Sequence, residues 1–89
     1  MLWLNPYAVL GLACCATQRD ELERAATLHG GADSLIVQSA VQWESLEETI
    51  RARDLAALAE RLGDDFDRHY AVGRAMPNDE IIRLASTTS

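Results

Sequence analysis

Apolar residues recur at three- and four-residue steps along the middle of the chain, between residues 34 and 72. The first set is Ile36, Val37, Ala40, Trp43, Leu46 and Ile50, and the second is Leu55, Leu58, Leu62, Phe66 and Tyr70. This spacing places each set along one side of a helix, and such a side is normally buried against other helices. Arg53 and Asp54 separate the sets. The pattern predicts a long antiparallel helical hairpin, about 34–52 and 54–72.

Helix start and stop signals predict short helices at both ends of this hairpin. Asn5 caps a helix well, and Pro6 suits its first position. Gly30-Gly31 is expected to end a second helix, Asp33 to cap the long arm, and Gly63 to make the second arm irregular. The expected short helices are 6–14, 17–28 and 78–86. The fold class is therefore all-α.

The 89 residues are expected to form one helical domain, 1–89. Its apolar share of 48% is normal for a folded domain. Residues 1–15 form an apolar N-terminal segment that is a candidate docking arm, and 86–89 form a tail. Since so small a domain buries a smaller share of its surface than larger domains do, a homo-oligomer is expected, with a dimer favoured.

The charge is acidic, with 14 Asp and Glu against 8 basic residues, all of them Arg, and a net charge of −6. This balance argues against direct binding to nucleic acid or to an anionic membrane, because Arg and Lys carry those contacts. The chain contains no apolar run of about 20 residues, and its beginning lacks the basic start of a signal peptide. A cytoplasmic protein is expected.

Cys14 and Cys15 are adjacent, so they do not form a secreted-type disulfide, and a reducing compartment suits them. Burial as small apolar residues is one interpretation, and reactivity is another. Together with His29 they could ligate zinc or form a nucleophile with a base. However, adjacent cysteines do not match the spacing of structural zinc sites. We expect no catalytic, cofactor or metal site here.

A carboxylate-rich metal site is the second candidate for chemistry. Asp65 and His69 are four residues apart on one helix, and Glu44 and Glu48 lie on the facing arm. Metal sites in helical bundles use facing residues of this kind, but with a Glu-x-x-His spacing that is absent here. The sequence therefore predicts no metal ligands.

Two resemblances to chaperone-related families concern parts of the chain. One segment is similar to the opening of a J-domain, a co-chaperone module: Asn5-Pro6-Tyr7-Ala8-Val9-Leu10-Gly11-Leu12, followed by Ala16-Thr17. The His-Pro-Asp loop of that family is missing, since Gly30-Gly31 follows His29. The Leu-rich hairpin with its Arg-Asp turn resembles the small acidic chaperones of flagellar and type III secretion systems.

The function expected from these features is that of a non-enzymatic, chaperone-like adaptor that covers an apolar or basic surface of a partner protein. The predicted partner-binding residues are Trp3, Leu4, Tyr7 and Leu10 in the apolar segment, and Glu60, Asp64, Asp65 and Asp67 on an acidic face. Apolar burial would provide affinity, and the acids would steer association. Two alternatives are an acidic inhibitor that occupies a nucleic-acid site on its target, and a small metal-binding or enzyme subunit.

Overall fold

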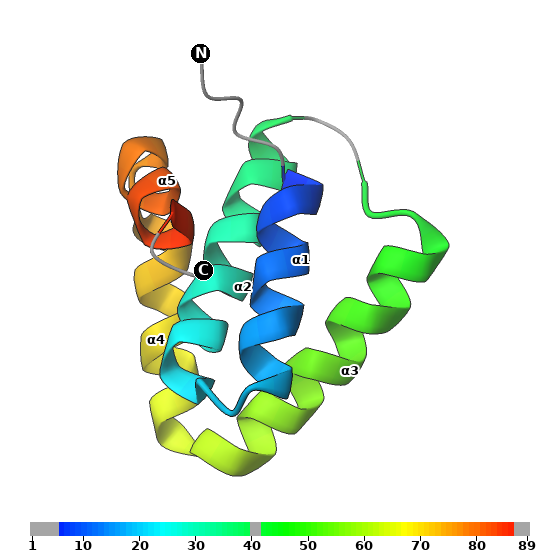
Figure 1. Ribbon diagram of the computed structural model, residues 1–89, viewed down its shortest axis with the longest axis vertical. Coiled ribbons are helices and arrows are strands. Elements are labelled where there is room, and N and C mark those ends of the chain that lie inside the picture. Colours follow the sequence, from blue (N-terminus) through cyan, green and yellow to red (C-terminus); the bar gives the residue numbers. More distant parts are fainter. Residues whose placement is uncertain (1–5, 40–41, 87–89) are drawn as a thin grey trace.

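The computed structural model describes residues 6–39 and 42–86 and shows an all-α fold (Figure 1). The helices in these ranges are α1 Pro6–Gln18, α2 Leu22–Gln38, α3 Ser45–Leu62, α4 Asp64–Ala75 and α5 Asn78–Ser86. These two ranges contain no strand. The all-α prediction is confirmed, and α5 occupies the range predicted for the final helix.

Helix α2 lies at the centre of the molecule and contacts each of the other four helices (Figure 1). Ten of its 17 residues are buried, many of them Ala or Gly. A helix that is enclosed on most sides needs small residues where its neighbours approach, and this composition provides them. The remaining elements are therefore placed by their contacts with α2.

The predicted helix end at Gly30-Gly31 is wrong, because α2 continues through both glycines. Two interior glycines cost about 1 kcal/mol each relative to Ala. Here, however, α4 crosses so closely that a Cβ on Gly30 would overlap the Tyr70 carbonyl oxygen. A Cβ on Gly73 would likewise overlap the Thr27 carbonyl oxygen. Glycine at positions 30 and 73 is thus required by contact between the two backbones.

The predicted turn at Arg53-Asp54 is also wrong. Helix α3 runs through both residues, and the Asp54 side chain is buried against His29 instead of capping a helix. The chain reverses at Gly63, whose φ of 59° lies in the left-handed region that favours glycine. From this turn α3 and α4 diverge (Figure 1). The expected hairpin is therefore confirmed only in part: two successive helices are present, with different ends and an open angle.

The hydrophobic core lies between α2 and its neighbours and is built from many small side chains. Its buried members are Val9, Leu10, Ala13, Ala16, Ala25, Leu28, Ala32, Leu35, Leu58 and Ile81. Trp43, predicted inside a helix, lies just before α3 and packs half-buried against this core. In the described part of the chain, no helix has the length and apolar character needed to cross a membrane.

Candidate functional site

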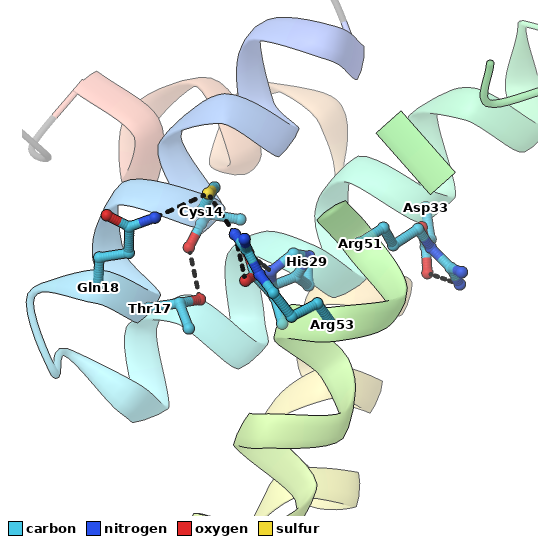
Figure 2. Close-up of polar contacts among 9 residues, drawn as sticks. Cys14, Thr17, Gln18, His29, Asp33, Arg51 and Arg53 are labelled. Atoms are coloured by element: carbon cyan, nitrogen blue, oxygen red, sulfur yellow. Dashed lines mark hydrogen bonds and ion pairs between the residues drawn. The ribbon is translucent and has the colours of Figure 1, made fainter. Parts of the chain in front are cut away.

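In the described structure, the carboxylate of Asp33, in the second half of α2, accepts more side-chain hydrogen bonds than any other side chain. Arg51 of α3 binds it with two donors: Nε lies 2.7 Å from Oδ1, and Nη2 lies 2.8 Å from Oδ2. The Trp43 Nε1 donates to Oδ1 over 3.2 Å, and the Tyr70 hydroxyl of α4 donates to Oδ2. Figure 2 shows the Asp33–Arg51 pair. One buried carboxylate therefore fixes α3, α4 and the segment before α3 to α2.

The electrostatics of this network favour its charged form. Burial on its own raises the pKa of Asp33, but the hydrogen bonds from Arg51 and Tyr70 outweigh burial, so the pKa lies below its ordinary value. The hydrogen bond to Asp33 raises the pKa of Arg51. Burial, together with the bond to Asp33, raises the pKa of Tyr70. Near neutral pH the network thus holds a carboxylate, a guanidinium and a protonated phenol.

An open cleft of about 760 Å³ lies over this network. We call it the Asp33 cleft, and its lining residues are Asp33, Ile36, Val37, Gln42, Trp43, Glu48, Arg51, Tyr70 and Arg74. Val37 is 65% exposed at its edge. The lining residues come from α2, α3, α4 and the segment before α3. We call the hydrogen-bonded residues Asp33, Arg51, Tyr70 and Trp43 the floor of the cleft, and the exposed edge at Val37 its lip.

A second buried polar group lies between α1, α2 and α3. His29 Nε2 is 3.3 Å from Asp54 Oδ2, and both side chains are almost fully buried. Arg53 Nη2 lies 3.5 Å from Asp54 Oδ1 and 3.8 Å from Cys14 Sγ. Figure 2 shows Cys14, His29 and Arg53 close together, apart from the Asp33–Arg51 pair. Unlike Asp33, Asp54 has an oxygen, Oδ2, with no well-aligned hydrogen bond from the described residues.

The surroundings of Cys14 do not activate its thiol as a nucleophile. Burial, with a contribution from Asp54, raises the pKa of Cys14, so the thiol stays protonated near neutral pH. Burial lowers the pKa of His29, although Asp54 opposes this effect. Cys14 and Cys15 are both free thiols.

The residues considered above as a possible metal site do not come together. His69 lies 3.0 Å from Glu23, and Asp65 forms an ion pair with Arg68. Among the residues of 6–39 and 42–86, no group of three or more His, Cys, Asp or Glu side chains has a metal-binding arrangement.

The structure separates the predicted apolar docking residues. Trp3 and Leu4 lie outside the described residues. Leu10 is only 3% exposed and belongs to the core, so in this conformation it is not available to a partner. Tyr7 is at the surface, where its ring meets Trp43 edge-on with 5.4 Å between centroids. Its hydroxyl donates to the Gln42 carbonyl over 3.4 Å. Tyr7 thus supports one wall of the Asp33 cleft.

The predicted acidic residues gather around the turn between α3 and α4, and all of them are exposed: Glu60, Asp64, Asp65 and Asp67. None of them lines the Asp33 cleft. Basic side chains lie among these acids: Arg61 binds Asp20 at 2.6 Å, and Arg68 binds Asp65 at 3.1 Å. The acidic and apolar parts of the predicted partner surface are therefore separate.

The sequence does not predict the Asp33 network. Its local signals indicate a helix cap at Asp33 and apolar stripe positions at Trp43 and Tyr70, and they indicate no role for Arg51 in such a network. The sequence separations between these residues reach 37 positions, and no periodic pattern connects them. The one local signal is an aspartate inside an otherwise small and apolar stretch of α2.

Comparisons of this chain with protein-family models, with curated proteins and with solved structures found no match.

Proposed function

We propose that this protein is a non-enzymatic interaction module that binds another protein through the Asp33 cleft. The observation that carries the proposal is the combination of a hydrogen-bonded floor with an exposed apolar lip. Arg51, Tyr70 and Trp43 are fixed by one carboxylate, so partner binding would require little side-chain ordering. Val37, 65% exposed, offers apolar area that the residues of 6–39 and 42–86 do not bury.

The acidic turn between α3 and α4 has a secondary role in this proposal. Exposed carboxylates there would accelerate encounter with a basic region of the partner and would lose this effect at high salt. The alternative, an inhibitor that imitates nucleic acid, needs a continuous acidic surface. Arg61 and Arg68 interrupt that surface by pairing with Asp20 and Asp65, so the observations favour binding through the cleft.

The cellular setting and assembly belong to the same proposal. Two free cysteines agree with a reducing, cytoplasmic compartment. A homodimer stays a prediction, which light scattering of the purified protein would test.

Site-specific photo-crosslinking in the native host tests the proposed function. A photoreactive amino acid at position 37 lies on the lip of the Asp33 cleft, and the same amino acid at position 83 lies on an exposed part of α5. The expected result is a discrete adduct with another protein from position 37 and none from position 83. No adduct from position 37, or the same adducts from both positions, would refute binding through the cleft.

A further inference from the structure

The Asp33 cleft presents more hydrogen-bond donors than acceptors to a ligand. The two oxygens of Asp33 already accept four hydrogen bonds, so they have little capacity left for a guest. Glu48, at the rim, accepts from Arg51 Nη1 over 3.0 Å, and this pairing offsets its charge. A cationic ligand would find no unpaired carboxylate in this cleft.

Arg74 supplies the available positive charge. It lines the cleft from α4 with an exposed side chain, and it forms no ion pair with any residue in the ranges 6–39 and 42–86. It is close enough to Tyr70 for its charge to lower the pKa of the phenol, although burial makes the net shift upward. Within the described ranges the Arg74 guanidinium donates no hydrogen bond, and its planar set of N–H donors is well suited to a carboxylate.

Apolar residues also line the cleft, namely Ile36 and Val37 of α2 and Trp43. Val37 is the most exposed of the three, at 65%. A ligand that satisfies both kinds of lining residue has a carboxylate for Arg74 directly joined to an apolar group for Val37 and Trp43. The C-terminal residue of a polypeptide has this arrangement when its side chain is apolar.

We propose that the Asp33 cleft binds the free C-terminus of a partner polypeptide whose last residue is apolar. The terminal carboxylate binds Arg74, and the last side chain packs on Val37 and the Trp43 ring. This inference rests on the proposed function and names the part of the partner that is recognised. Affinity should fall as ionic strength rises, because the Arg74 contact is exposed to solvent.

The minimal probe is N-acetyl-leucine, with N-acetyl-leucinamide as the uncharged control. A Trp3→Phe variant leaves Trp43 as the single tryptophan, so its fluorescence reports on the cleft. For a ligand of this size we expect a dissociation constant on the order of 1–10 mM. The acid should give a saturable change and the amide should bind about tenfold more weakly. A pentapeptide ending in a free leucine should bind more tightly than N-acetyl-leucine.

The matched variants are Arg74→Gln and Arg68→Gln, both exposed arginines of α4, of which only Arg74 lines the cleft. In the first, affinity for the acid should fall about tenfold to the level of the amide, and in the second it should be unchanged. Unchanged thermal unfolding confirms that both variants fold. Equal binding of acid and amide, no saturable binding, or an unaffected Arg74→Gln variant would overturn the proposal. A pentapeptide no tighter than N-acetyl-leucine would overturn the assignment to a polypeptide.

Failure of this inference is distinguishable from failure of the proposed function. If crosslinking from position 37 captures a partner while the acid and amide probes bind equally, the cleft binds protein without recognising a C-terminus. If position 37 captures nothing, the proposed function itself fails, whatever the probes show.

Discussion

Helix α2 is held to α4 and to α3 by two different kinds of contact. Against α4 the decisive contact is backbone on backbone, at Gly30 and Gly73. Against α3 it consists of charged and polar side chains, Asp33 with Arg51 and His29 with Asp54. The first contact is steric, so it should be intolerant of added volume and insensitive to pH. The second is electrostatic, so its contribution should change in steps as individual hydrogen bonds and charges are removed.

The largest expected effect comes from adding one methyl group at the α2–α4 contact. In Gly73→Ala the new Cβ would overlap the Thr27 carbonyl oxygen, so the two helices must move apart. We expect a loss of about 3 kcal/mol in the free energy of unfolding, a large share of the roughly 5–10 kcal/mol of a small domain. Urea denaturation followed by far-ultraviolet circular dichroism measures this change.

Gly11→Ala is the matched control, because a Cβ at this exposed position of α1 meets open space. It should stabilise the protein by about 0.5–1 kcal/mol through helix propensity alone. If Gly73→Ala also stabilised the protein, the steric explanation of the α2–α4 contact would be wrong.

The next largest effect is expected in Asp33→Ala, which removes the polar α2–α3 contact together with the hydrogen bond from Tyr70 of α4. This substitution leaves the guanidinium of Arg51, the Tyr70 hydroxyl and the Trp43 indole without their shared acceptor. Since these donors are only partly buried, water can reach some of them, and we expect a loss of about 2 kcal/mol. Asp33→Asn keeps one acceptor oxygen and should lie between the wild type and Asp33→Ala in the same urea experiment. An Asn variant equal to the wild type would show that the charge of Asp33 does not matter.

A smaller effect is expected from His29, and it depends on pH. Because the pKa of folded His29 is below its unfolded value of about 6.5, the unfolded chain binds a proton that the folded chain does not. Stability should therefore be fully present above about pH 6.5 and fall as the pH drops from there toward the folded pKa. Asp33 acts at lower pH: its pKa is lowered, so its stabilisation is lost below its unfolded value of about 3.9.

A double variant, His29→Leu with Asp54→Ala, separates these two contributions. Replacing the buried pair by apolar side chains of similar total volume should keep stability at pH 7 within about 1 kcal/mol of the wild type. It should also flatten the stability profile between about pH 5 and 7, as measured by urea denaturation at each pH. A profile as steep as that of the wild type would assign the pH dependence to other groups.

The α2–α4 and α2–α3 contacts also explain which features of the fold can be predicted from the sequence. The fold class, the range of α5 and the interruption at Gly63 follow from local signals, namely periodicity, capping and the low helix propensity of glycine. The predicted helix end at Gly30-Gly31 is wrong because the partner of Gly30 is the Tyr70 carbonyl group, which lies 40 positions farther along the chain. Nothing near Gly30 in the sequence distinguishes a glycine that ends a helix from one that admits a second helix.

The candidate site was less predictable than the fold for the same reason. Asp33 has a favourable residue type for capping, and Tyr70 continues an apolar stripe. Each of these two interpretations is reasonable when the residue is considered on its own. The Asp33 network arises only when α3 and α4 are placed around α2, so its residues are related by three-dimensional packing and not by spacing. No local signal marks Arg74, because only the packing of α4 against α2 places it at the cleft.

The smallest effect on stability is expected at Glu48, which shares the guanidinium of Arg51 with Asp33. Arg51 contacts buried Asp33 at 2.7 Å and half-exposed Glu48 at 3.0 Å. Glu48→Gln should lower the free energy of unfolding by only about 0.3 kcal/mol, because solvent and salt screen the exposed pair. In about 1 M salt this loss should disappear, whereas most of the Asp33→Ala loss should persist because its acceptor is buried. If Glu48→Gln destabilised the protein as much as Asp33→Ala, burial would not explain the difference in strength between the two ion pairs of Arg51. Glu48 would then have to be counted with Asp33 among the residues that hold the floor of the Asp33 cleft.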